Sequence, residues 1–296
     1  MMNLFILYYC AFALLLPTIT ALELPTYPGL RTNTSRPGLL QIAFNNTSSA
    51  INVWSQDALS GLTDIVRRLR NDTETKVLLF TSDKPFYFMA HLDLTIQPFD
   101  VTIAQRTAEL LHNMTNLNQV TIGAVNGVAR GAGNEFLVSL DMRFAVKSHT
   151  RLGQPEIGLG LIPGGGGSQY LPRLIGRGRA FEYLLTGQDV LAEEAERLGW
   201  INKAFDKEGE MEAYVDEIVS RLVLFPVEAL GLIKQSVNIA SRPQLADTVG
   251  DANRFLQTAS RPMAQKLIGD FLELTANQSA GDIELYLGDN VRLLYD

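Results

Sequence analysis

A short glycine-rich segment with a glutamate at its end is the first candidate for chemistry. In residues 126–135, small residues open a predicted helix, and Glu135 follows within its first turn. The first backbone N–H groups of a helix lack intrahelical partners and the helix dipole is positive there, so such a site suits a developing oxyanion. Taken alone, the segment also fits a tight packing turn with a solvent-facing, helix-stabilising Glu135.

A second segment, residues 154–169, begins Gln-Pro-Glu and contains four consecutive glycines at 164–167. Glu156 is a candidate acid or base, although alone it also fits a capping or surface carboxylate. The glycine run lacks the Gly-Lys-Ser/Thr ending of a P-loop, so a sharp, close-packed turn is favoured over a phosphate site. A third cluster, residues 86–94, contains three aromatic residues and His91 and follows a predicted strand.

Alternating strands and helices must position these three segments. Apolar runs predict buried strands at 38–44, 76–81, 119–125 and 142–146. Helices are expected between them, at 55–70, 100–115 and 131–140. This alternation predicts α/β units around a mainly parallel sheet. Helical spacing dominates the last third of the chain, so we expect an α/β core over residues 22–215 and a helical C-terminal region over 216–296.

The composition restricts the classes of function. The chain is 46% hydrophobic and 19% charged, and its formal net charge of −7 argues against sequence-independent nucleic-acid binding. Cys10 is the single cysteine, which excludes an intrachain disulfide and a cysteine-based metal site. The three histidines, His91, His112 and His149, share no metal-ligand spacing, so no structural metal is predicted.

The first 21 residues are treated separately from the fold. Residues 4–16 form an apolar run of thirteen residues, which is the length of a signal-peptide core and short for a membrane span. We expect a leader over residues 1–21, either cleaved after Ala21 or used for membrane association through residues 4–16. Six N-x-S/T sequons favour a glycosylated chain, at Asn33, Asn45, Asn46, Asn71, Asn113 and Asn277.

Together the three segments resemble the crotonase (enoyl-CoA hydratase/isomerase) superfamily, in order, over about residues 38–234. Residues 126–141 are similar to its N-G-x-x-x-G-G-G-x-E…D motif, and residues 154–169 to its Q-P-E…P-G-x-G-G-T-Q motif. Residues 186–202 are similar to its T-G…A-x-E-A…G-L-V segment. The resemblance implies an α/β, crotonase-like spiral of β-β-α units followed by a helical C-terminal region.

The resemblance also implies a chemistry. The backbone N–H groups of Leu92 and Ala132 would form an oxyanion hole that polarises a thioester carbonyl. Glu135 and Glu156 would be the acid/base pair of an enoyl-CoA hydratase, which adds water to a 2-enoyl-CoA thioester or removes it. No permanently bound cofactor is implied, because coenzyme A enters as part of the substrate. That requirement leaves the compartment open, since coenzyme A is largely intracellular whereas the leader favours secretion.

Further carry-overs from the family concern substrate contacts and assembly. Contacts to the substrate or its coenzyme A are implied for Ala90, Asp93, Gly131, Gly133, Gly164 and Lys234, and homotrimers or hexamers are common in the family. His91 stands where the family has glycine, and Ala132 replaces another glycine, which narrows the pocket. For His91, one interpretation is a packing change with the imidazole turned away from the thioester. The other is a pocket residue that alters substrate choice.

Alternative functions follow from the same residues. A Δ3-Δ2 enoyl-CoA isomerase needs only one base, and a specialised acyl-CoA enzyme of secondary metabolism would fit the altered first motif. A non-catalytic protein with the same fold would fit the leader and the sequons. A serine hydrolase is disfavoured, because Ser139 and Ser168 have no supporting His/Asp arrangement.

Overall fold

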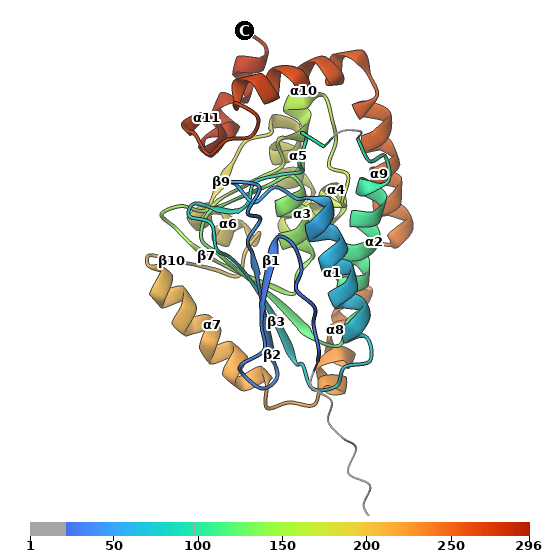
Figure 1. The fold of residues 1–296 in the computed structure, drawn as a ribbon, viewed down its shortest axis with the longest axis vertical. Helices are drawn as coiled ribbons and strands as arrows, with labels where there is room; N and C mark the ends of the chain where they lie inside the picture. The colour runs from blue at the N-terminus through green and yellow to red at the C-terminus, as the bar shows by residue number, and fades with distance from the viewer. Residues whose placement is uncertain (1–21, 97–98) are drawn as a thin grey trace, which may run out of the picture.

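The computed structural model describes residues 22–96 and 99–296, so the expected leader lies outside the described residues. It is an α/β fold built on two sheets (Figure 1). The larger sheet has the strand order β1 (Leu30–Asn33), β2 (Leu39–Phe44), β3 (Val77–Ser82), β5 (Val120–Val125), β7 (Met142–Val146) and β10 (Lys203–Phe205). Strand β1 is antiparallel to β2, and the remaining neighbours are parallel, as the alternation of strands and helices predicted.

The smaller sheet is made of very short strands. Its order is β4 (Tyr87–Met89), β6 (Val128–Arg130), β8 (Arg151–Gly153) and β9 (Val190–Leu191), of which only β9 runs antiparallel to its neighbour. Strands β3, β5 and β7 of the larger sheet are each followed by a strand of the smaller sheet and then by a helix. The expected spiral of β-β-α units is therefore confirmed.

Helices complete each unit. They are α1 (Gln56–Leu69), α2 (Ile103–Thr115), α3 (Ala132–Ser139), the 3-10 helix η1 (Pro155–Leu159), α4 (Gly167–Ile175), α5 (Arg177–Thr186) and α6 (Ala192–Leu198). Helix α1 begins at Ser55, whose side chain accepts a hydrogen bond from the Ala58 N–H, and it buries the apolar face that its spacing predicted. Stacked and edge-on aromatic rings, including Phe44, Phe80 and Phe136, fill the space between α3 and the larger sheet.

From Glu208 onward the named elements are helical. They are α7 (Glu208–Leu222), α8 (Val227–Ser241), α9 (Leu245–Ala259), α10 (Pro262–Leu274), α11 (Asp282–Leu285), α12 (Leu287–Asn290) and the 3-10 helix η2 (Val291–Leu294). The expected division at residue 215 falls inside α7, which with α8 covers the other face of the larger sheet. Helix α9 packs along α2, and α10 and η2 lie against η1 (Figure 1). This return of the C-terminus closes the site described next.

Candidate active site

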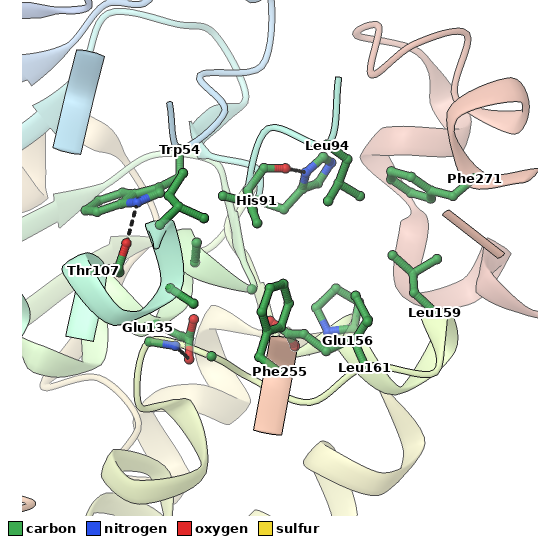
Figure 2. Close-up of a pocket in the computed structure, with 18 of the residues that line it drawn as sticks. Trp54, His91, Leu94, Thr107, Glu135, Glu156, Leu159, Leu161, Phe255 and Phe271 are labelled. Atoms are coloured by element: carbon green, nitrogen blue, oxygen red, sulfur yellow. Dashed lines mark hydrogen bonds between the residues drawn. The ribbon is translucent and has the colours of Figure 1, made fainter. Parts of the chain in front are cut away.

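One cavity is enclosed by the start of α3, by η1, by the loop after β4 and by the C-terminal helices (Figure 2). Glu135 of α3 and Glu156 of η1 both lie in its wall. Most of the remaining wall is apolar, and Phe255, Phe271 and Leu287 of the C-terminal helices contribute to it. A carboxyl group that faces such a wall is poorly solvated, so its neutral form is favoured.

Glu135 is held by the glycine run. Its Oε1 accepts hydrogen bonds from the backbone N–H groups of Gly165 (2.7 Å) and Gly167 (2.8 Å). Burial raises the pKa of Glu135 to about 7, against the opposing effect of the glycine N–H groups. The run of glycines lets this turn approach closely, since a Cβ on Gly165 would lie 2.9 Å from Glu135 Oε2. The turn expected from the sequence thus has a definite purpose, which is to hold a carboxylate.

Glu156 lies across the cavity beside the opening turn of α3. A Cβ on Gly131 would lie only 2.9 Å from Glu156 Oε1, and Gly131 also adopts a φ of +47°, which favours glycine. With its amide nitrogen turned to Glu156, the buried Gln154 side chain lies 3.0 Å from both carboxylate oxygens and accepts from Asn134 Nδ2 at 3.0 Å. The amide of Asn134 is fixed in turn by Trp200 Nε1, which donates to its oxygen at 2.9 Å.

The two carboxyl groups have separated proton affinities. Burial, and then the charge of Glu135, raise the pKa of Glu156 well above its ordinary value. Two backbone N–H groups, of Gly165 and Gly167, donate to Glu135 and favour its carboxylate form, whereas Glu156 faces the single amide nitrogen of Gln154. Near neutral pH the geometry therefore favours an ionised Glu135 and a protonated Glu156, which is a base and an acid in one cavity.

Two backbone N–H groups complete the polar part of the site. Ala132 is the first residue of α3. Leu92 forms a β-bridge with Trp54. In this bridge the Trp54 N–H donates to His91 O, and the Asp93 N–H donates to Trp54 O. Neither the Leu92 nor the Ala132 N–H donates a hydrogen bond to an acceptor in residues 22–96 and 99–296. Both residues line the cavity, so these donors are available to an oxygen atom of a ligand.

His91 lines the cavity, yet both of its ring nitrogens face oxygens of the chain itself. Nδ1 lies 2.8 Å from Leu92 O, and Nε2 lies 3.1 Å from Glu284 Oε1. The interpretation of His91 as a pocket residue agrees with the ring's place in the wall. Nε2 therefore points toward the C-terminal segment and Nδ1 toward the neighbouring backbone, an arrangement that agrees with the packing interpretation.

Comparison with known proteins gives the same result as the motifs. Residues 34–278 match the family described as "Enoyl-CoA hydratase/isomerase". The chain belongs to this family. It is 34% identical over 69% of its length to a short-chain-enoyl-CoA hydratase of Clostridium acetobutylicum, of which it covers 79%. It is 33% identical over 67% of its length to a crotonyl-CoA hydratase of Syntrophomonas wolfei, of which it covers 78%.

A solved structure extends this similarity to the fold. The crystal structure of a putative enoyl-CoA hydratase from Streptomyces avermitilis superimposes with a TM-score of 0.84 at 33% identity, covering 91% of this chain and 98% of that one. The resemblance to the crotonase superfamily, drawn from the motifs, is confirmed. Because the chain belongs to this family, it is an enzyme of the enoyl-CoA hydratase/isomerase type.

Several other residues singled out from the family motifs lie near the cavity without all lining it. Gly131 and Gly164 are in its wall. Gly133 packs against β4, where a Cβ would lie 2.1 Å from Met89 O. Ala90 is fully buried in a small apolar cluster, and Asp93 Oδ1 accepts hydrogen bonds from Thr95 and from Gln278 Nε2. Gly133, Ala90 and Asp93 therefore support the walls of the site without lining the cavity.

Lys234 lies apart from the other residues singled out from the family motifs. It is buried on α8, where its ammonium group donates to Gln119 O and lies 2.8 Å from Asp141 Oδ2. It does not line the cavity, and its charge is taken up by Asp141. A buried ammonium group requires such a partner, so the structure gives Lys234 a structural ion pair, and its expected contact with coenzyme A stays a prediction.

Sequence reasoning missed the residues that close the cavity. Trp54 is one of them, and its Nε1 donates to Thr107 Oγ1 at 2.9 Å (Figure 2). Phe255, Phe271, Leu287 and Val291 come from the last helices, beyond the motifs. Among the aromatic residues at 86–88, Tyr87 and Phe88 are core residues, whereas Phe86 is exposed. Only the apolar spacing of the C-terminal helices signals that such residues are buried.

Proposed function

We propose that this chain is an enoyl-CoA hydratase that uses Glu135 and Glu156 as its acid/base pair. The observation that carries the proposal is the pair of buried carboxyl groups that face one cavity, each with a raised pKa and with different hydrogen-bond partners. A single base would suffice for isomerisation, whereas addition of water requires one group to accept a proton and another to deliver one. The hydratase names of the relatives support the same choice.

In the proposed reaction, the thioester oxygen lies between the N–H groups of Leu92 and Ala132, which stabilise the enolate as it forms. Glu135, ionised near neutral pH, accepts a proton from water while the hydroxyl oxygen bonds to the β-carbon. Glu156, protonated, delivers its proton to the α-carbon. The net result is addition of water across the double bond, which leaves Glu156 ionised and Glu135 protonated. Proton exchange with water then restores the starting state for the next turnover. The same steps in reverse give dehydration.

The test is the hydration of crotonyl-CoA, followed as loss of absorbance, with the variants Glu135→Gln and Glu156→Gln. Each substitution should lower kcat by about 10²–10⁴, because each removes one proton-transfer group and keeps the side-chain shape. A parallel assay with a 3-enoyl-CoA measures isomerisation. An active isomerase in which Glu135→Gln is nearly silent would replace the hydratase assignment.

The non-catalytic alternative is tested with the same protein. A wild-type chain that turns over neither thioester and is not stabilised against heat by coenzyme A would support that alternative. Stabilisation by coenzyme A together with turnover would exclude it. A preference for some other acyl-CoA, with both glutamates still required, would point to the specialised enzyme.

Assembly into a homotrimer or hexamer belongs to the proposal as well. Helix α8 exposes four apolar side chains, Leu232, Ile233, Val237 and Ile239, which are 59–89% exposed. A second copy that covers this face would remove them from water. No single helix among the described residues is long and apolar enough to cross a membrane, although α7 and α8 pass that test as a pair bent by 111°.

Secretion and glycosylation are proposed from the leader and the sequons alone. Asn71 and Asn277 are exposed, so a glycan on either would extend into solvent without rearrangement. The remaining sequon asparagines are half-buried, at Asn33, Asn45, Asn46 and Asn113. Exposure of the first two supports a glycosylated chain and identifies them as the sites to examine first.

A further inference from the structure

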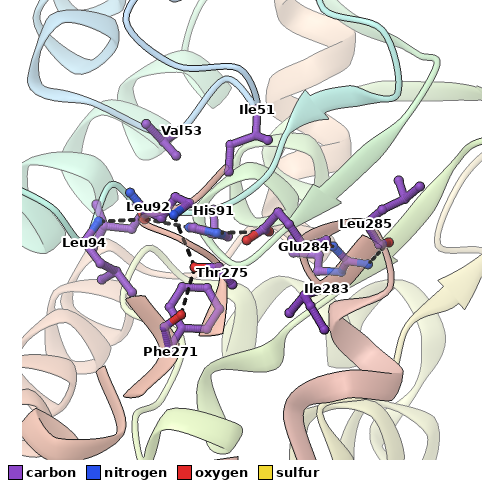
Figure 3. Close-up of polar contacts among 12 residues, drawn as sticks. Ile51, Val53, His91, Leu92, Leu94, Phe271, Thr275, Ile283, Glu284 and Leu285 are labelled. Atoms are coloured by element: carbon purple, nitrogen blue, oxygen red, sulfur yellow. Dashed lines mark hydrogen bonds and ion pairs between the residues drawn. The ribbon is translucent and has the colours of Figure 1, made fainter. Parts of the chain in front are cut away.

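A buried network of charged groups joins the loop after β4 to the C-terminal segment (Figure 3). His91 and Glu284 form an ion pair with 3.1 Å between Nε2 and Oε1, and their side chains are 8% and 0% exposed. Arg130, also fully buried, forms a bidentate pair with Asp189 and donates to the carbonyl oxygens of Glu284 and Leu285. The two pairs lie side by side, and His91 is the member that reaches the cavity.

The charges of this network balance only when the His91–Glu284 pair keeps its proton. Arg130 is already neutralised by Asp189, and it uses its remaining N–H groups on backbone carbonyls. Within residues 22–96 and 99–296, the Glu284 carboxylate accepts no hydrogen bond, so the charge of His91 is its direct partner. A buried carboxylate without a compensating charge costs several kcal/mol.

The other groups around the pair do not alter this balance. Arg130 of β6 attracts Glu284 and repels His91. Tyr87 of β4 is near Glu284 and keeps its proton, since burial raises its pKa to about 12. Asp282 is exposed, and from α10 the Phe271 ring packs edge-on against the imidazole. Burial lowers the pKa of His91, but Glu284 and the Leu92 carbonyl outweigh it, so the pKa is raised, while that of Glu284 is lowered.

The ring geometry links this charge to the oxyanion donor. Nδ1 faces the Leu92 carbonyl at 2.8 Å and Nε2 faces a carboxylate, so both nitrogens face acceptors. An imidazolium ion suits both contacts, because it carries a proton toward the Leu92 carbonyl and a positive charge toward the Glu284 carboxylate, with which Nε2 forms an ion pair without hydrogen-bond geometry. In a neutral ring, one nitrogen would turn a lone pair toward an oxygen. Protonation of His91 therefore fixes the backbone at Leu92, whose N–H faces the cavity.

We propose that His91, held as an imidazolium ion by Glu284, is a positioning residue that orients the Leu92 N–H of the oxyanion hole. The inference rests on the proposed function, because it assigns that N–H to the thioester oxygen. It also makes the orientation dependent on the docked C-terminal segment, since Glu284 belongs to α11. His91 thus acts through Leu92 and need not touch the substrate.

The experiment compares wild type with Glu284→Gln, which keeps the shape of the side chain and removes its charge. We expect kcat for crotonyl-CoA to fall about tenfold with KM within about twofold, because a misdirected oxyanion donor weakens the transition state more than the bound substrate. The alkaline limb of the kcat profile should move to lower pH, because His91 loses its proton earlier without Glu284. A purely structural role would lower the folded fraction without moving that limb.

Nuclear magnetic resonance gives a readout that does not require turnover. The imidazole signals of His91, identified by their loss in His91→Gln, should titrate above the ordinary range in wild type and at lower pH in Glu284→Gln. The Leu92 amide signal should shift along the same titration curve. His112 and His149 serve as internal controls, and Glu273→Gln on the exposed face of α10 is the matched variant that should change none of these quantities.

Two results would overturn the inference. One is a His91 titration, or an alkaline limb, that is identical in wild type and Glu284→Gln. The other is a Leu92 amide that does not respond as His91 titrates. Wild-type protein without hydratase or isomerase activity would instead count against the proposed function, and the two resonance titrations would still decide whether His91 orients Leu92.

Discussion

Two carboxyl groups buried in one cavity serve chemistry at the expense of stability. Burial raises the pKa of Glu135 to about 7 and also raises that of Glu156 well above its ordinary value. A glutamate whose folded pKa exceeds its unfolded value binds protons more tightly when folded. Its contribution to stability is therefore present at low pH and is lost as pH rises from the ordinary glutamate range through the folded pKa. At pH 8 Glu135 is above its pKa and is ionised in an apolar wall, and holding Glu156 in its protonated form also costs free energy relative to the unfolded chain, so both groups oppose folding.

Glu156→Gln should therefore be more stable than wild type at pH 8 although it is inactive. The neutral amide removes a buried ionisable group, so we expect a midpoint of thermal unfolding a few degrees higher at pH 8. The gain should shrink at pH 5, where the wild-type carboxyl is already protonated. Thermal unfolding at both pH values measures this difference. Glu212→Gln, on the exposed face of α7, is the control and should leave the midpoint unchanged. A midpoint for Glu156→Gln at pH 8 that is equal to or lower than that of wild type would contradict the prediction.

At the residue scale, the motifs identified the residues that they contain, but not the partners of those residues that lie far away in the chain. Glu135 and Glu156 stand in specific motifs, so their convergence on one cavity could be predicted. Glu284 lies almost two hundred residues from His91 in the chain, and nothing in its local sequence marks a buried glutamate. The ion pair of Lys234 with Asp141 could not be predicted either, because a family correspondence at one position does not reveal which side chains of the same protein it contacts.

At the scale of elements, strand length decided what could be predicted. The apolar runs of β2, β3, β5 and β7 are five or six residues long, and all four were predicted. Strands β4, β6 and β8 have three residues each, which is too short for any periodicity to be read. These short strands nevertheless place the site, since β4 precedes the Leu92 loop and β6 leads directly into α3.

The close contact between the start of α3 and β4 gives a prediction at this scale. A Cβ on Gly133 would lie 2.1 Å from Met89 O, a backbone atom of a paired strand that cannot move aside. Gly133→Ala should therefore displace the start of α3, and with it the Ala132 N–H and Glu135. We expect a loss of about 1–3 kcal/mol in the free energy of unfolding, measured in urea, and a lower kcat.

The matched control for this substitution is Gly178→Ala. Gly178 lies in α5, and a Cβ there would meet no atom within 4 Å. Alanine favours a helix over glycine by about 0.5–1 kcal/mol, so this variant should be slightly more stable and fully active. If Gly133→Ala were as stable and as active as Gly178→Ala, the close contact between α3 and β4 would not be needed to form the site.

At the scale of the whole molecule, the C-terminal segment completes a site whose motifs lie far upstream. Leu287 and Val291 form part of the cavity wall, and a Cβ on Gly158 of η1 would lie 2.1 Å from Val291 Cγ2. Tyr295 donates a hydrogen bond from its hydroxyl to Gly158 O at 3.0 Å. The end of the chain is therefore packed onto the same short helix that carries Glu156. Folding of the C-terminus and formation of the acid/base pair are coupled through these contacts.

Arg130 is the polar anchor of this segment, and its removal tests the coupling. Arg130→Met leaves Asp189 buried without its partner and leaves the carbonyls of Glu284 and Leu285 without this donor. The free energy of unfolding, measured in urea, should therefore fall by about 3–5 kcal/mol. Arg31→Met is the matched control, since Arg31 forms the same bidentate contact with Asp83 but is 57% exposed, and should lose less than about 1 kcal/mol.

Amide hydrogen exchange distinguishes a loosened C-terminal segment from general destabilisation. In Arg130→Met, exchange over residues 282–294 should accelerate more than exchange over β3 and β5, because the lost contacts hold that segment to the core. Uniform acceleration across the chain would mean that Arg130 stabilises the fold without anchoring its end. Selective acceleration, with a fall in kcat under conditions where the core stays folded, would show that docking of the last helices is a condition for activity.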